Sequence, residues 1–240
     1  MKKYAFLLVV LGGLMTTSLS AQISVEAGYE NSVMRLNDGY EVESTDPFNG
    51  FYVGAFYDIA LSENGIHAFS IQPGLKYSYA RFAESESMEY DDYPMGDAPM
   101  ILPGMKLKIQ DHYVAVPVRF QYAVAVSPDI RIKAFAVPSA VVGLASTLSF
   151  ATTGMGEYDL EGSFDLFSGK GKGEFEGEDI GEGVFKRFDL SLGLGLGLEL
   201  MDRFELRGGY DFGLINRYID ADDDITCKRN TFYIGLGFRF

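Results

Sequence analysis

The sequence predicts an all-β fold: an eight-stranded, antiparallel, up-and-down transmembrane β-barrel with short periplasmic turns and long extracellular loops. Three observations lead to this prediction. Apolar residues alternate with small or charged residues in repeated segments, these segments are even in number as in bacterial barrels, and short and long connections alternate between them. A period of two is the pattern of a strand whose two faces meet different environments.

The first residues have the layout of a secretory signal peptide. Two lysines near the start are followed by an apolar stretch, residues 4–15, and by small and polar residues up to Ala21. The apolar stretch is shorter than the about 20 residues of a membrane-spanning helix. We therefore expect residues 1–21 to be removed during export and residues 22–240 to form one outer-membrane barrel domain.

The charge balance and the single cysteine exclude several classes of protein. The chain has 34 acidic and 20 basic residues and a formal net charge of −14. Such a surface should repel nucleic-acid phosphates, so we expect no nucleic-acid partner. Cys227 is the only cysteine, which excludes an internal disulfide framework and suggests an incidental loop thiol. No segment after the leader approaches the roughly 18 consecutive apolar residues of a spanning helix, but an exported chain can still cross a membrane as a closed barrel.

The clearest strand prediction covers residues 188–200, where apolar residues alternate without a break with small or charged ones. The apolar set is Phe188, Leu190, Leu192, Leu194, Leu196, Leu198 and Leu200. The glycines between them lie inside a strand and have the wrong spacing for a nucleotide-binding loop.

The same alternation predicts the other strands. They cover residues 23–29, 51–59, 69–79, 114–122, 204–214 and 232–240, and an extended segment at 131–146 is apolar on both faces, so its facing is left open. Short turns are expected at 61–66, 127–129 and 201–203, and long polar loops at 31–49, 83–104, 147–183 and 215–229. Short connections are periplasmic and long ones extracellular in outer-membrane barrels.

A soluble barrel such as a lipocalin also alternates, with its apolar face turned inward. Three features favour the membrane barrel. The opposite face is rich in Gly, Ser and opposed charges that can fill a narrow lumen, aromatic residues gather near strand ends as in interface girdles, and the chain ends on Phe240 after an alternating strand. The aromatic residues are Tyr29, Tyr77, Tyr79, Tyr122, Phe188, Phe204 and Phe232.

Four stretches match, in order, the strand motifs of one known family. They are residues 113–122 (YVAVPVRFQY), 188–193 (FDLSLG), 210–216 (YDFGLIN) and 234–240 (IGLGFRF). On these stretches the sequence resembles the PorT-like outer-membrane β-barrel family over essentially the whole chain after the leader. Ala115 replaces the family's usual acid, and Arg119 and Gln121 stand near its usual lysine. The resemblance implies a Gram-negative outer-membrane location and a secretion-accessory role, with a secretion-complex protein as partner.

Catalysis has few candidate residues. His67 is expected beside a periplasmic turn and His112 on the upper part of the fourth strand, so the two should not share a site. The spacing of Ser or His with an oriented acid, as in membrane-barrel lipases and acyltransferases, is not visible. We interpret Asp111 and His112 as a solvated rim pair, and we expect no enzymatic activity, no cofactor and no catalytic residue.

Two acidic segments invite other interpretations. The run at residues 220–224 lacks the Gly and Glu of an EF-hand loop, because Ile225 and Thr231 stand at those positions. It is interpreted as a solvated acidic loop, and a loose divalent-cation site is left open. The segment 147–183 lacks the Lys-Ser/Thr ending of a phosphate-binding loop and is interpreted as flexible and anionic.

Charged residues on the inner face are expected to form an ion-pair network, because unpaired charges in a narrow interior are very costly. The predicted network is Glu26, Asp58, Lys76, Arg119, Asp189, Glu199, Glu205, Arg207, Asp211 and Arg239. Such a network would plug the lumen, and a gated pore is the alternative.

The last strand carries a lipid-facing row that we expect the barrel-insertion machinery to recognise. The row consists of Phe232, Ile234, Leu236, Phe238 and Phe240. The expected function is a non-enzymatic scaffold, embedded in outer-membrane lipid, that presents acidic loops outside the cell. A small gated pore and a membrane-embedded lipid-modifying enzyme are the alternatives.

Overall fold

The computed structural model describes residues 22–37, 42–45, 47–86, 104–153, 160–172, 183–219 and 226–240. In this part of the chain no helix is long and apolar enough to cross a membrane. The predicted leader, residues 1–21, and the acidic run at 220–224 lie outside the described residues. The strands are β1 (Gln22–Asn37), β2 (Val42–Ser44), β3 (Phe48–Asn64), β4 (His67–Glu86), β5 (Gly104–Ser127), β6 (Ile130–Thr153), β7 (Glu161–Asp165), β8 (Gly171–Lys172), β9 (Phe188–Leu200), β10 (Phe204–Gly213) and β11 (Thr226–Arg239).

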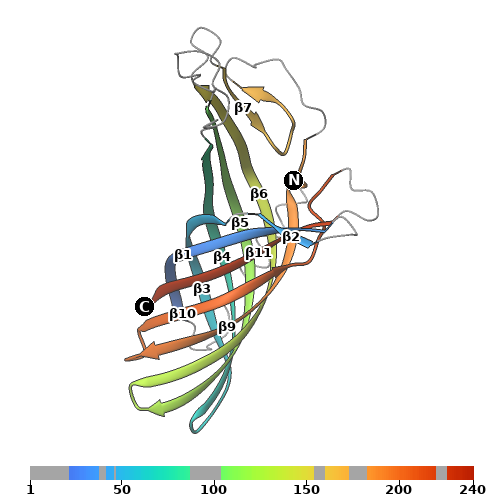
Figure 1. Cartoon of the computed structure of the whole chain (residues 1–240). Coiled ribbons are helices and arrows are strands. Elements are labelled where there is room, and N and C mark those ends of the chain that lie inside the picture. The colour runs from blue at the N-terminus through green and yellow to red at the C-terminus, as the bar shows by residue number, and fades with distance from the viewer. Residues whose placement is uncertain are drawn as a thin grey trace, which may run out of the picture.

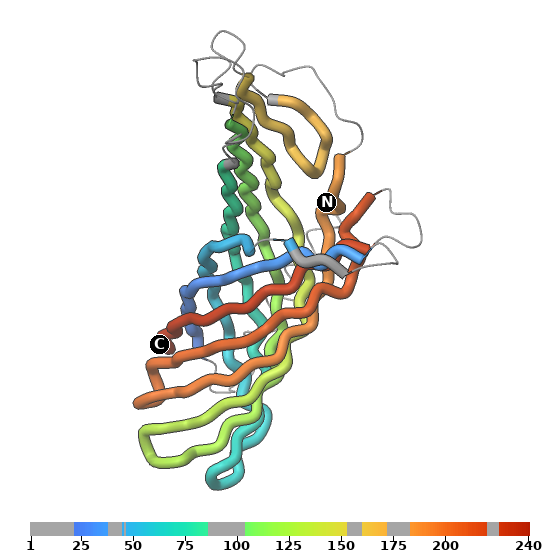
Figure 2. The backbone as a smooth tube through the Cα atoms, viewed as in Figure 1, coloured from blue at the N-terminus to red at the C-terminus, as the bar shows by residue number. Residues whose placement is uncertain are grey.

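Eight of these strands form a closed antiparallel ring. Around the ring the order is β1, β3, β4, β5, β6, β9, β10 and β11, which is also the order in the chain. The last strand pairs with the first over fourteen residue pairs from Ser24↔Arg239 to Asn37↔Thr226, and Figure 2 shows the red end of the trace beside the blue beginning. The predicted eight-stranded up-and-down barrel is therefore confirmed.

The two faces of the barrel wall differ as the alternation predicts. Outward-facing side chains are apolar and exposed, for example Leu196 at 65% and Leu236 at 69% exposed, whereas inward-facing Glu26 is 5% exposed. The same alternation in β6 settles the facing of residues 131–143: Lys133, Phe135, Val137 and Ser139 point inward and are buried. An irregularity at Leu144 then changes the parity, and Ser146 points inward. An apolar exterior around a polar interior is the arrangement of a membrane barrel.

The two ends of the barrel are different. At the turn end, residues 65–66, 128–129 and 201–203 make the predicted short turns. At the other end, which we call the long-segment end, much of what the sequence predicts as loop continues as strand. β5 and β6 are 24 residues long, more than twice the about 9–11 residues that a tilted strand needs to cross, and they rise above the ring and carry β7 (Figure 1).

Cys227 shows the consequence of these longer strands. The predicted loop thiol belongs to β11 and is only 1% exposed. It packs with Met34, Phe48 and Ala80 in an apolar cluster inside the long-segment end. The prediction of an incidental loop thiol is therefore wrong, because the apolar residues that bury it come from β1, β3 and β4, far away in the sequence.

Glycines on the inner face make room for large rings. A Cβ on Gly195 would overlap the Phe135 ring, and one on Gly235 would overlap the Tyr52 hydroxyl group. The two tyrosines Tyr52 and Tyr233 meet edge to face, with ring centroids 5.9 Å apart. Glycine on one wall therefore lets an aromatic side chain from another wall lie flat across the narrow lumen, which packs the interior.

Aromatic side chains form a belt near each end of the outer face, as predicted. At the turn end Phe69 packs on Tyr122 at 4.7 Å, and Phe204 on Phe238 at 5.4 Å, between ring centroids. At the long-segment end, Phe51 packs on Tyr79 at 5.5 Å. We call this second group the upper belt; it consists of Tyr29, Phe51, Tyr77, Tyr79 and His112.

Two neighbouring glycines give a matched test of this packing. A Cβ on Gly209, which faces inward, would lie 2.7 Å from the Tyr233 ring, whereas one on Gly208, which faces lipid, would have only a backbone oxygen at 3.6 Å. Gly209→Ala should lower the free energy of unfolding by about 1–3 kcal/mol through overpacking, and Gly208→Ala should leave it unchanged or slightly higher. Urea unfolding in lipid vesicles measures both. Equal losses would mean that the inner face is not tightly packed.

Candidate functional site

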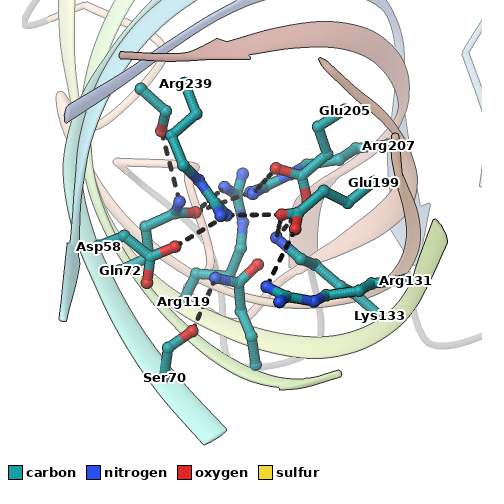
Figure 3. Close-up of polar contacts among 12 residues, drawn as sticks. Asp58, Ser70, Gln72, Arg119, Arg131, Lys133, Glu199, Glu205, Arg207 and Arg239 are labelled. Atoms are coloured by element: carbon teal, nitrogen blue, oxygen red, sulfur yellow. Dashed lines mark hydrogen bonds and ion pairs between the residues drawn. The ribbon is translucent and has the colours of Figure 1, made fainter. Parts of the chain in front are cut away.

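The ten charged residues predicted to face the lumen all lie on ring strands, and most of them form three groups. Figure 3 shows side chains from several walls converging at the centre of the barrel. The groups are a turn-end cluster (Asp58, Arg131, Lys133, Glu199 and Arg239), a central layer (Glu26, Gln72, Arg119, Glu205 and Arg207) and an upper group (Glu30, Lys76, Asp211 and Arg229).

Glu199 of β9 is the hub of the turn-end cluster. Its carboxylate lies 2.5 Å from Lys133 Nζ, 2.7 Å from Arg239 Nη2 and 3.4 Å from Arg131 Nη1. Arg239 also pairs with Asp58 at 3.0 Å. Glu199 is only 2% exposed, so water cannot hydrate its carboxylate fully. Charged side chains from β6 and β11 take the place of that water.

The partners of Arg239 differ from those that proximity of strands suggests. Because β1 and β10 flank β11, the alternation predicts that Arg239 pairs with Glu26 and with Glu205 or Asp211. In the structure, Arg239 pairs with Asp58 and Glu199 instead. The strands are staggered, so that Ser24 rather than Glu26 lies opposite Arg239, and long side chains in a narrow lumen reach walls that are not adjacent.

The central layer joins side chains from different walls of the barrel. The Gln72 Oε1 atom accepts hydrogen bonds from Arg119 Nη1 at 2.6 Å and from Arg207 Nη1 at 2.8 Å. Glu26 Oε2 lies 3.3 Å from Arg119 Nη2 and 3.6 Å from Arg207 Nη1, and Arg207 also pairs with Glu205. Four strands thus supply one connected layer of side chains.

The two arginines of this layer sit against aromatic rings. The Arg119 guanidinium carbon lies 4.4 Å from the Phe56 ring centroid and 5.2 Å from that of Phe135. Tyr52 completes the layer by donating its hydroxyl hydrogen to Glu26 Oε1 at 2.6 Å. Planar guanidinium groups stack well on rings while they bind carboxylates at their edges, so the layer combines apolar packing with charge pairing. Its charged side chains, Glu26, Arg119, Glu205 and Arg207, are all buried.

The upper group continues the network toward the long-segment end. Lys76 Nζ lies 3.5 Å from Glu30 and 3.8 Å from Asp211, and it sits 5.1 Å from the centroid of the Tyr52 ring. Arg229 pairs with Glu30 at 3.6 Å. A small cavity of about 50 Å³ lies among these residues, and a larger one of about 290 Å³ is lined by residues of the turn-end cluster. The central layer separates the two.

Asp189 departs from the predicted network. Among the described residues it has no ion-pair partner within 4 Å, and its carboxylate accepts the backbone N–H of Leu190 at 2.7 Å. Asp189 stands at the start of β9, near the long-segment mouth. Asp189 therefore lies outside the three groups of ion pairs, and its electrostatic neighbours are Arg217 and Arg229 at the mouth.

The mouth at the long-segment end holds a cluster that the sequence does not predict. Arg217, 1% exposed, donates from Nη2 to the Tyr113 hydroxyl group at 2.7 Å, and Tyr113 donates to Asp111 at 2.9 Å. Ser146 donates to the other oxygen of Asp111 at 2.6 Å. Asp111 therefore faces inward and does not form a rim pair with His112.

Some residues of these clusters were not predicted, and they differ in whether the sequence contains a pattern that could have identified them. Lys133 and Gln72 sit at inward positions of alternating strands, so pairing the strands side by side would have found them. Arg217 follows β10 in a segment without alternation, and only the fold of residues 214–219 over the mouth brings it to Tyr113. No sequence pattern identifies such a contact.

Both histidines lie on the outer face. The Tyr122 hydroxyl group is 2.7 Å from Nδ1 of His67, and the Tyr77 hydroxyl group is 2.7 Å from Nδ1 of His112. The first pair belongs to the turn end and the second to the upper belt, so they do not share a site. Within the described residues, no group of three or more His, Cys, Asp or Glu side chains is arranged to hold a metal ion.

Comparison with known proteins places these features in a family. The family model described as "outer membrane protein beta-barrel domain" matches residues 16–218. No curated protein matches the sequence significantly. Solved structures with a similar course of the chain include Ail, the attachment invasion locus protein of Yersinia pestis (14% identity, 92% of this chain and 99% of that chain, TM-score 0.37), Neisserial surface protein A (11%, 92% and 99%, 0.39) and the outer membrane protease OmpT of Escherichia coli (8%, 94% and 99%, 0.40). At this level of similarity no activity or partner is transferred to this chain.

Removing one partner from the central layer should be costly. Arg207→Met keeps most of the side-chain volume but leaves Glu205 without one of its cations, and losing one partner of a buried pair costs about 3–5 kcal/mol. Adding Glu205→Gln should recover part of this loss. Urea midpoints of the single and double variants in vesicles measure the coupling, with lipid-facing Leu196→Ala as a control. Simple addition of the two single losses would contradict a coupled network.

Proposed function

The chain belongs to the outer membrane protein β-barrel family, and we propose that it is a non-enzymatic scaffold, closed to solutes, that anchors an extended structure at the long-segment end in the outer membrane. The single observation that supports this proposal best is the central layer. Its side chains are buried and joined across the lumen by hydrogen bonds and ion pairs. An eight-stranded interior is just wide enough for side chains to fill, so a connected layer of buried side chains should block a continuous water path.

The strands that rise beyond the ring are what the scaffold would present. β5 and β6 extend well past the upper belt, and β6 pairs with β7 through Thr147↔Asp165 to Ala151↔Glu161. Leu166 and Phe167 are buried beside the mouth. Rigid strands of this kind hold neighbouring loops at a fixed distance from the membrane, as a platform for a protein partner requires.

The nature of the partner rests on the PorT-like resemblance alone. By that resemblance we propose a secretion-complex protein that contacts the long-segment end. The net charge of −14 favours a basic surface on such a partner. A loose divalent-cation site at the acidic run 220–224 remains part of this proposal, outside the described residues.

A gated pore is the second candidate, and one observation favours it. The cavities of about 290 Å³ and about 50 Å³ lie on opposite sides of the central layer, so that rearrangement of this one layer would join them. A lipid-modifying enzyme is the weaker alternative, since His67 and His112 pair with tyrosines on the outer face and not with acids.

Conductance in planar bilayers separates scaffold from pore. The wild-type barrel should show no steady single-channel current, because the central layer blocks the lumen. Arg119→Ala combined with Arg207→Ala should produce current if the barrel remains folded, and lipid-facing Leu196→Ala should not. A steady wild-type current would replace the scaffold proposal by the pore.

We also propose that the outward row of β11 guides assembly. Phe240 is 73% exposed and packs on Phe238 at 5.1 Å between centroids. Phe240→Asp should lower the folded, heat-modifiable fraction in the outer membrane, because a charge at this place weakens both the lipid contact and the recognition by insertion machinery. Met201→Asp, on an exposed turn at the same end, is the control. Equal yields of Phe240→Asp and wild type would refute the proposal.

A further inference from the structure

The outer face just beyond the upper belt carries basic side chains and no acidic ones. On β1, β3, β4, β5, β6 and β11, the described outward positions beyond the belt hold, apart from Val33, only basic, amide, hydroxyl and small side chains. The basic ones are Arg35, Arg81, Lys106, Lys108 and Lys228. We call these five side chains the cationic band.

Three members of the band lie together on β4 and β5. The register pairs Arg81 with Gln110 and Ala83 with Lys108, so Arg81 and Lys108 are diagonal neighbours, about 7–8 Å apart along the sheet. Lys106 lies two residues before Lys108 in the chain, on the same face. On the adjacent β6, the outward residues opposite these lysines are Ser149 and Ala151. One patch therefore offers three cations without an internal counter-charge.

The other two members are direct cross-strand neighbours. Arg35 of β1 pairs with Lys228 of β11, and both side chains are exposed. Like charges placed directly opposite each other destabilise a sheet. An anion bound between them would remove this repulsion, as it would in the β4–β5 patch.

Composition does not account for the band. The chain has 34 acidic against 20 basic residues, and the other face of the same strand segments carries Glu30, Glu84 and Asp111. Among the described residues, no member of the band has a carboxylate oxygen within 4 Å of its charged nitrogen atoms. The nearest described acids on the outward side of this sheet are Glu161 and Asp165 of β7, separated from β5 by β6.

Arg81 and Lys108 stand nearest to the height of the lipid headgroups, and Lys106 lies farther out on the same strand. Arg81 lies two residues beyond Tyr79, and Lys108 lies four residues beyond His112. At about 3.3 Å per residue on a tilted strand, both side chains stand a few ångströms to about 10 Å beyond the aromatic belt. The headgroup region extends roughly 5–7 Å beyond each side of the hydrocarbon, and basic side chains bend toward it on their apolar stems.

We propose that the cationic band binds the phosphate groups of phosphorylated lipids in the outer leaflet of the outer membrane. Charge complementarity carries this assignment, because the band is the one place on the described outward surface where several bases gather without acids. With the long connections outside, as in bacterial barrels, the band stands at the phosphate-bearing headgroups of the outer leaflet. The contact would fix the height of the barrel and hold the β4–β5–β6 extension upright. This inference does not depend on whether the barrel is a scaffold or a pore.

The test uses the folded full-length barrel in phosphatidylcholine nanodiscs that contain a small fraction of a bis-phosphorylated lipid A-type glycolipid. After release into mild detergent, native mass spectrometry counts the glycolipid molecules that each barrel retains. Each Lys or Arg near an anionic surface contributes about 1 kcal/mol, so Arg81→Gln or Lys108→Gln should lower the binding constant about fivefold. The triple variant with Lys106→Gln should lower it on the order of a hundredfold.

Two matched controls remove the same charge away from the band. Lys170→Gln changes an exposed lysine at the same end but on the β7–β8 connection, and Arg203→Gln changes an exposed arginine at the turn end. Both should retain the glycolipid as wild type does. Heat-modifiable gel mobility, measured for every variant, shows that each barrel is folded before its lipid is counted.

Three results would overturn the proposal. Equal retention of the glycolipid and its dephosphorylated form would show that phosphate is not recognised. Wild-type retention by the folded triple variant would remove the band from the site. Stabilisation of the barrel by inorganic phosphate as strong as that by the glycolipid would show a site for free anions and not for lipid headgroups.

Discussion

Every strand of a membrane barrel must find hydrogen-bond partners on both edges, because the hydrocarbon offers no water to unpaired backbone groups. In this chain the pairing of β1 with β11 meets that requirement by closing the ring. Closure joins the two ends of the domain, sets the stagger of the strands and encloses a lumen of fixed width. The outer face then contacts lipid, and everything polar along the alternating strands must be accommodated inside.

The enclosed polar face explains the character of the interior. A narrow lumen cannot hydrate isolated charges, so each cation of the three groups meets carboxylates from other walls, as Lys133 and Arg239 meet Glu199. The space for these long side chains and for Tyr52 and Phe135 comes from glycines on facing strands. Packing and charge pairing therefore depend on each other, because small residues on one strand leave room for large side chains that reach across the lumen from another strand.

The outer surface is divided along the axis of the barrel by the same alternation. Apolar residues cover the middle, aromatic rings mark the ends, and beyond the upper belt the outward positions become polar and basic. This sequence of zones follows the membrane from hydrocarbon to headgroup, which is why the cationic band and the belt belong to the same strands. The extension of β5 and β6 beyond these zones is then held by a wall that is anchored both in the lipid and by its own filled interior.

The period of two in segments such as residues 190–200 determined the fold class, the number of ring strands and the facing of most charged side chains. Alternation can be recognised within one strand, because it does not depend on which strands pair with it. The sequence by itself did not determine the lengths of β5 and β6 or the burial of Cys227, since the pattern weakens where a strand leaves the membrane and its two faces meet similar surroundings. The pairing of Arg239 with Asp58 and Glu199, and the position of Arg217 at the mouth, were decided only by the tertiary structure. The physical reason is that partners inside a staggered, narrow ring are chosen by height and reach across the lumen, and neither quantity exists until the ring has closed.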